Sequence, residues 1–121
     1  AQTVKLCGDG LTIYSGNDDQ ITAFMSLGAK GVVSVLSNIA PRAVHDMVKM
    51  YLDGDTAAST ELQLKYLDLC SSLFSDVNPI PVKEAMNMMG MEVGSCRLPL
   101  AQIQPQAKEK LRRSLSTFGM I

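Results

Sequence analysis

The sequence lacks what marks several common classes of protein. Its 11 Lys and Arg residues nearly balance its 12 Asp and Glu residues, for a formal net charge of −1. The acidic and basic residues are also interspersed along the chain, which argues against the concentrated basic face that binds nucleic acid. No apolar run approaches the roughly 20 residues that cross a membrane, and the first residues do not resemble a signal peptide. These absences favour a protein that neither spans a membrane nor binds nucleic acid.

Cysteine is scarce, and its spacing is uninformative for metal or disulfide chemistry. Cys7, Cys70 and Cys96 are odd in number and lie far apart. Disulfide frameworks and zinc sites both require paired spacing, so we expect no metal site. Three thiols in apolar surroundings instead suit buried cysteines in a cytoplasmic protein.

Few other side chains are candidates for catalysis. His45 is the sole histidine, has no second histidine or cysteine nearby, and lies between apolar residues of a predicted helix. Asp18 and Asp19 stand at a helix start, where carboxylates commonly cap the helix and oppose its dipole. The basic cluster Lys108, Lys110, Arg112 and Arg113 is interpreted in the same way, as a favourable charge at a helix C-terminus rather than an anion site.

Residues 11–40 carry the clearest pattern in the chain. A short apolar strand over 11–14 is followed by a helix over 18–27 and by a β-branched strand over 31–35, typical of buried parallel strands. The connection, residues 15–30, is long enough for a helical crossover between parallel strands. The sequence therefore predicts a right-handed βαβ unit.

The rest of the chain is predicted to be helical. Apolar residues at three- and four-residue steps predict helices over about 41–52, 56–76, 81–89 and from 105 onward. The predicted buried face of the second helix is Leu62, Tyr66, Leu69, Cys70, Leu73, Phe74 and Val77, and that of the last helix is Ala107, Leu111, Leu115 and Phe118. The segment Asn78-Pro79-Ile80-Pro81 ends the long helix and precedes the helix over 81–89. Two parallel strands leave both edges unpaired and are marginal alone, so the pattern indicates part of a larger parallel sheet or barrel.

Five segments, in order, resemble the dihydrodipicolinate synthase family of pyruvate-dependent class I aldolases, which includes N-acetylneuraminate lyase. They are Tyr14-Ser-Gly-Asn-Asp, Leu27-Gly-Ala-Lys-Gly-Val-Val-Ser-Val, Ser37-Asn-Ile-Ala-Pro, Asn78-Pro-Ile-Pro-Val-Lys and Arg97-Leu-Pro-Leu. The resemblance implies an α/β fold that is the C-terminal part of a (β/α)₈ TIM barrel. Residues 1–54 are then the last two βα units, and residues 55–121 are an appended helical region.

The resemblance also implies a reaction. The parent enzyme is expected to condense pyruvate with L-aspartate-4-semialdehyde to 4-hydroxy-tetrahydrodipicolinate, in lysine (diaminopimelate) biosynthesis. A lysine of the sixth strand forms a Schiff base with pyruvate, and no cofactor is needed. That lysine and the other catalytic residues belong to the first six βα units, so we expect no catalytic residue here and no activity of this chain alone. We expect a homo-oligomer, or pairing with the N-terminal part.

Two residues match the family's substrate contacts by position. Gly16 is expected to let the backbone approach pyruvate closely, and Val33 is expected to line the pocket beside the Schiff-base carbons. The alternatives are that Gly16 only turns the chain and that Val33 is barrel core. For the function, the alternatives are N-acetylneuraminate lyase, a keto-deoxy-sugar-acid aldolase, or a non-catalytic interaction fragment that pairs through its open sheet edge.

Overall fold

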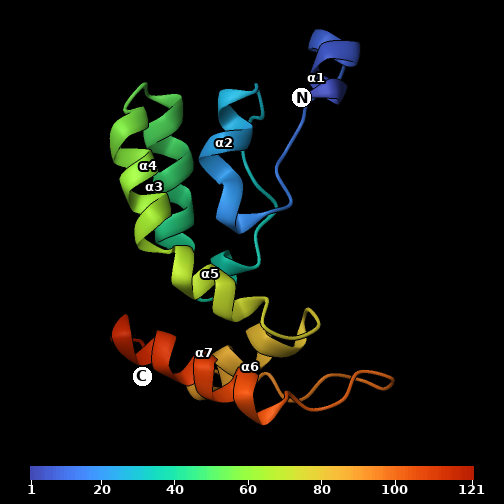
Figure 1. Ribbon diagram of the computed structural model, residues 1–121, viewed down its shortest axis with the longest axis vertical. Coiled ribbons are helices and arrows are strands. Elements are labelled where there is room, and N and C mark those ends of the chain that lie inside the picture. The colour runs from blue at the N-terminus through green and yellow to red at the C-terminus, as the bar shows by residue number, and fades with distance from the viewer. The chain divides into compact units, whose positions relative to one another are not determined.

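The computed structural model describes residues 1–121, which are mostly helical (Figure 1). They divide into two units, Ala1–Tyr66 and Leu67–Ile121. The first unit holds α1 (Gln2–Cys7), η1 (Gly8–Gly10), η2 (Asp18–Gln20), α2 (Ile21–Ser26), η3 (Leu36–Asn38), α3 (Pro41–Leu52) and α4 (Thr56–Lys65). The second holds α5 (Leu67–Leu73), α6 (Ile80–Met88) and α7 (Pro105–Thr117). The expected boundary between barrel units and helical region, at 54/55, stays a prediction.

The two predicted strands are reduced to a single parallel bridge, between Ser15 and Val32. Ser15 N–H donates to Gly31 O at 2.9 Å, and Val33 N–H donates to Ser15 O at 2.8 Å. The prediction of full strands over 11–14 and 31–35 is therefore wrong, although the parallel direction is confirmed. The pairing does not continue toward the N-terminal ends of the two segments. A regular parallel ladder would require Gly31 N–H to donate to Ile13 O, but Lys30 N–H donates to it instead. Neither segment has a further neighbour within this chain to extend the pairing.

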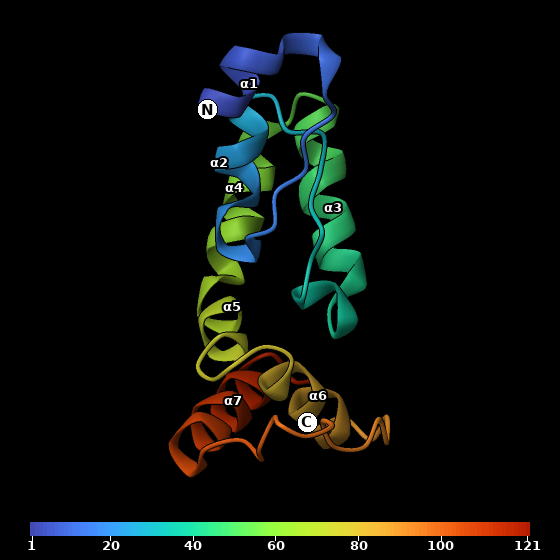
Figure 2. The same cartoon turned by 90° about the vertical axis from the view of Figure 1, so that its right-hand side faces the viewer.

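Helices α2, α3 and α4 pack against one another in the first unit and lie on one side of this pair, which runs between α2 and α3 in the view of Figure 2. The predicted bounds of α3 are confirmed, with Pro41 in its first turn, where a missing N–H costs little. Val44 and Met47 are buried on its inner face. Helix α4 packs along α3, and Ser59 Oγ on α4 donates to Met47 O at 2.7 Å. A polar contact thus lies at the centre of this helix pair.

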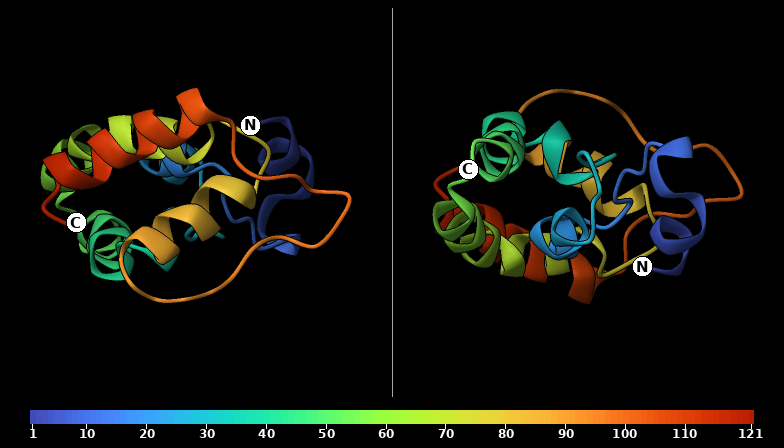
Figure 3. Two further views of the ribbon diagram at one scale, coloured as in Figure 1. Left: turned by 90° about the horizontal axis from the view of Figure 1, so that it is seen from below. Right: turned by 90° about the horizontal axis from the view of Figure 1, so that it is seen from above.

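The second unit packs α7 against α5 and α6 (Figure 3). The predicted helix over 56–76 is divided at Tyr66 into α4 and α5. On its second half Leu69 and Leu73 are buried as predicted, whereas Phe74 and Val77 are exposed, contrary to the prediction. Helix α7 buries Ala107, Leu111 and Leu115 of its predicted stripe, whereas Phe118, at the C-terminal cap, is only partly buried.

The expectation that the three cysteines are buried is confirmed for one of them. No cysteine forms a disulfide, and Cys70 is buried, but Cys7 is exposed and Cys96 is partly exposed. In addition, none of the helices combines the length and apolar character needed to cross a lipid bilayer.

Candidate functional site

Gly16 and Val33, the two predicted substrate contacts, lie beside each other in the first unit. Val33 N–H bonds to Ser15 O, and Gly16 is the next residue after Ser15. Val33 is unusually open for a β-branched residue, with 75% of its surface exposed, and Gly16 is exposed as well. The fold therefore brings both residues to the end of the parallel pair and leaves them uncovered by the rest of the chain.

The chain itself does not require glycine at position 16. Gly16 is absent from the residues with positive φ, so its backbone is open to any L residue. A Cβ added there would meet no atom within 4 Å. Gly31 differs, because a Cβ there would lie 3.3 Å from the Tyr14 ring. The alternative that Gly16 serves only to turn the chain thus finds no support in the backbone.

Asp18 connects the two segments that leave the bridge. It is 1% exposed, and its Oδ2 accepts Val35 N–H at 2.8 Å and Leu36 N–H at 2.9 Å. The prediction that Asp18 caps the helix at its own position is therefore wrong. It caps η3 instead, because the first N–H groups of that helix have no intrahelical partner and attract a carboxylate. Asp18 Oδ1 is buried without a hydrogen-bond partner.

Gln63 of α4 completes this connection. It is 4% exposed, accepts Ile21 N–H at Oε1 (2.9 Å), and donates from Nε2 to Asp18 O at 2.7 Å. Sequence reasoning missed Gln63, since no apolar spacing marks it and its partners lie more than forty positions away. A glutamine amide can donate and accept at once, and here both groups bind the turn that follows Gly16.

No lysine is buried in the core of this chain. Six of its seven lysines are exposed, and Lys83 is half-buried. The Nζ of Lys83 donates to Ser95 O at 2.8 Å in the second unit. His45 is exposed on α3, where its Nδ1 lies 2.9 Å from Asp46 Oδ1. No cluster of three or more His, Cys, Asp or Glu side chains is arranged to hold a metal ion.

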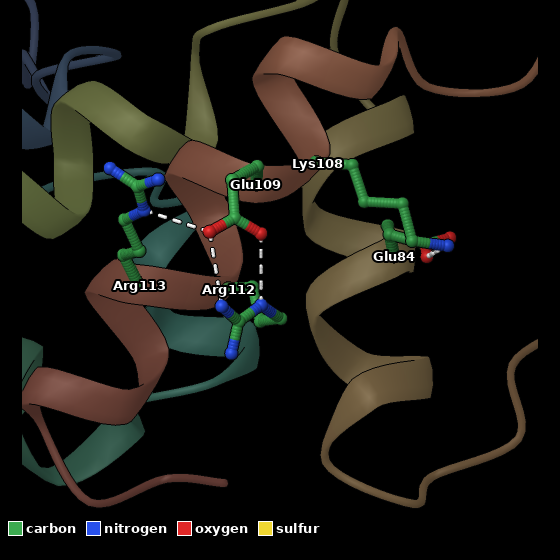
Figure 4. A network of polar contacts seen from close by, with 5 residues as sticks. All are labelled: Glu84, Lys108, Glu109, Arg112 and Arg113. Atoms are coloured by element: carbon green, nitrogen blue, oxygen red, sulfur yellow. Dashed lines mark hydrogen bonds and ion pairs between the residues drawn. The ribbon is translucent and has the colours of Figure 1, made fainter.

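Three of the four basic residues of the α7 cluster are in ion pairs (Figure 4), whereas Lys110 Nζ donates to Ser71 Oγ at 2.9 Å. Glu109 accepts from Arg112 Nε and Nη2, both at 3.0 Å, and from Arg113 Nε at 2.8 Å. These bonds lower the pKa of Glu109 to about 2. Lys108 pairs with Glu84 at 2.6 Å. The predicted dipole role is wrong, since the last turn of α7 contains no basic residue.

A parallel pair joined by a helix and followed by α3 is the layout that ends a (β/α)₈ barrel, and solved barrel enzymes superpose on it. The crystal structure of dihydrodipicolinate synthase from Aquifex aeolicus matches with a TM-score of 0.93 and 39% identity, over 98% of this chain and 41% of that one. The chain is thus a part of a TIM-barrel protein. The model of the Dihydrodipicolinate synthetase family matches residues 1–118, and the chain belongs to that family.

Named relatives agree with this assignment. The 4-hydroxy-tetrahydrodipicolinate synthase of Lachnoclostridium phytofermentans is 51% identical over 121 residues, the whole of this chain and 41% of the relative. A chloride-inhibited dihydrodipicolinate synthase from Acinetobacter baumannii, solved in complex with pyruvate, matches with a TM-score of 0.90 and 36% identity, over 98% of this chain and 40% of that one. The chain therefore spans about two fifths of the length of the proteins it matches.

Proposed function

We propose that this chain is the C-terminal part of a 4-hydroxy-tetrahydrodipicolinate synthase and supplies one wall of its pyruvate pocket. The observation that carries the proposal is the pair formed by Gly16 and Val33, which the backbone sets side by side and leaves uncovered. In TIM-barrel enzymes the active site lies where strands end at the C-terminal face, and both residues lie at that end of their segments. The names of the relatives support the reaction, and the A. baumannii complex supports pyruvate as the ligand.

In the proposed reaction a lysine amine attacks the ketone carbon of pyruvate, and water leaves as the C=N bond of the Schiff base forms. The protonated imine withdraws electrons, so the methyl group loses a proton and its carbon attacks the aldehyde of L-aspartate-4-semialdehyde. The lysine belongs to the preceding part of the barrel. Gly16 permits close approach of the backbone to pyruvate, and Val33 excludes water from the imine. No cofactor takes part.

The partner of this chain is the polypeptide that supplies the earlier βα units. Three large side chains of the first unit support this, because Tyr14, Val33 and Leu52 are 55%, 75% and 58% exposed. Tyr14 and Leu52 also border an open groove, lined mainly by apolar residues of the bridge and α3. Parallel strands paired to both sides of the Ser15–Val32 bridge satisfy its free edges and bury these side chains. Assembly as a homo-oligomer stays a prediction.

A chimaera tests the proposal. It joins the N-terminal part of the L. phytofermentans enzyme, up to the matched region, to this whole chain. After incubation with pyruvate and reduction with borohydride, we expect one pyruvyl-lysine adduct per chimaera by intact mass, and none on this chain alone. We also expect consumption of L-aspartate-4-semialdehyde and no cleavage of N-acetylneuraminate.

The L. phytofermentans enzyme itself is the positive control for trapping. A chimaera that matches it in far-UV circular dichroism and yet forms no adduct contradicts the proposal. A stoichiometric adduct on the isolated chain contradicts the claim that the nucleophile comes from elsewhere.

A further inference from the structure

We infer that Asp18 and Gln63 are positioning residues that hold Gly16 at a fixed place beside Val33. Their role rests on the proposed function, because both residues build the pyruvate wall without touching the substrate. The contacts that support it all lie within the first unit.

Asp18 is placed between the two segments of the parallel pair. It lies two residues after Gly16, and the first N–H that it binds, that of Val35, lies two residues after Val33. The bridge joins the segments just before the site, through Ser15 and Val32. Asp18 joins them again just after it. Gly16 and Val33 therefore lie between two contacts that join the segments: the Ser15–Val32 bridge and the hydrogen bonds of Asp18. While both contacts hold, neither residue can shift along the parallel pair.

Asp18 joins the two segments through a single carboxylate oxygen, Oδ2. Oδ2 accepts both N–H groups, at 2.8 and 2.9 Å, while Oδ1 has no partner. No second contact of the carboxylate replaces these bonds when Oδ2 is lost. A buried N–H group left without an acceptor is costly, so removal of the carboxylate frees the two segments to separate.

Helix α4 supports the same turn through Gln63. Its Nε2 binds the carbonyl oxygen of Asp18 itself, at 2.7 Å, and its Oε1 binds the N–H of Ile21, at 2.9 Å. Both bonds fix the backbone of the turn that carries Asp18, so they aim its side chain at η3. At the near end of the same turn, Ser15 Oγ accepts Asn17 N–H at 3.0 Å. The turn from Gly16 to Ile21 is thus fixed at both ends by buried or partly buried polar bonds.

A substitution series in the chimaera separates positioning from simple stability. Asp18→Asn keeps one oxygen that can accept both N–H groups, Asp18→Ala keeps none, and Asp19→Ala removes the neighbouring exposed carboxylate as a matched control. We expect Asp18→Ala to raise the KM for pyruvate about tenfold or more. Asp18→Asn is expected to restore most of the affinity, and Asp19→Ala is expected to match the wild type. All KM values are measured well below the melting temperature of each variant.

A second variant keeps the test decisive if Asp18→Ala does not fold. Gln63→Glu keeps the acceptor for Ile21 N–H and replaces the donor to Asp18 O by a second acceptor. We expect it to raise the KM for pyruvate as well. Leu64→Ala, at the exposed neighbouring position on α4, is its matched control and is expected to leave the KM unchanged. Amide exchange by mass spectrometry on the isolated chain is expected to speed up at residues 35 and 36 in the Asp18→Ala variant.

The outcomes for the two proposals differ. An unmodified chimaera that forms no pyruvate adduct overturns the proposed function, and the positioning role with it. If the unmodified chimaera forms the adduct and Asp18→Ala leaves the KM for pyruvate unchanged, the positioning role alone is overturned. Where Asp18→Ala is unfolded, an unchanged KM in Gln63→Glu has the same consequence. A variant with a lower melting temperature and an unchanged KM for pyruvate also overturns the positioning role, because the residue then only stabilises the fold.

Discussion

Replacement of Gly16 by alanine gives the clearest separation between folding and binding. The position has no positive φ, and an added Cβ meets no atom within 4 Å. Alanine at such a site restricts the unfolded chain, so we expect the isolated chain to be more stable by about 0.4–1 kcal/mol. In the chimaera the same methyl group enters the space that pyruvate is proposed to approach. Overpacking of that kind costs about 1–3 kcal/mol, which weakens pyruvate binding roughly 5- to 150-fold.

Gly10→Ala is the matched control for this prediction. Gly10 also lacks a positive φ, and a Cβ there meets no atom within 4 Å, but it lies in η1, away from the bridge. Urea unfolding of the isolated variants measures stability, and the pyruvate dependence of adduct formation in the chimaera measures binding. Unchanged pyruvate affinity in Gly16→Ala, or the same loss in both variants, refutes the reasoning that Gly16 faces the substrate.

Three further predictions test other parts of the molecule. Ser59→Ala removes the buried bond to Met47 O and is expected to lower the free energy of unfolding by about 1 kcal/mol in urea titrations, with no loss if the bond is unimportant. Val33→Asp is expected to leave the isolated chain as stable as before, because Val33 is exposed, and to prevent the chimaera from forming a pyruvate adduct; an unaltered yield of adduct contradicts the pocket assignment. The pKa of Glu109 is lowered from 4.5 to about 2, so its ion pairs stabilise the fold above pH 4.5 and are lost as the pH falls toward 2. Glu109→Gln is expected to be less stable than wild type at pH 6, with the difference shrinking steadily as the pH falls from 4.5 to 2, and an NMR titration with a midpoint near 4.5 argues against the lowered pKa.

Apolar periodicity predicted the helices well where burial is apolar. The bounds of α3 and the inner stripe of α7 follow from residues such as Met47 and Leu111, which recur at helical spacing and are fully buried. The same reasoning failed for the outer end of the predicted long helix, where Phe74 is exposed. Apolar spacing identifies one face of a helix, but it does not show which turns of that face lack a packing partner.

The polar part of the candidate site was beyond such rules. Gly16 and Val33 were placed by resemblance, and their proximity then follows from the parallel pairing. Asp18 was expected to cap its own helix because capping is a local interaction, yet its partners are 17 and 18 residues away. Gln63 gave no signal at all. Buried polar contacts between distant residues depend on the completed packing, which a single sequence does not reveal.

The same contacts explain how so small a pairing can hold a site in shape. One parallel bridge fixes few backbone atoms, and a pair of strands without neighbours is marginal in water. Here the order comes from the segments that follow the bridge, since the carboxylate of Asp18 ties them together and Gln63 ties Asp18 to a helix. The helices therefore do more than cover the parallel pair. They keep Gly16 beside Val33 within this chain, and in the proposed enzyme this pair is the part of the pyruvate pocket that the chain supplies.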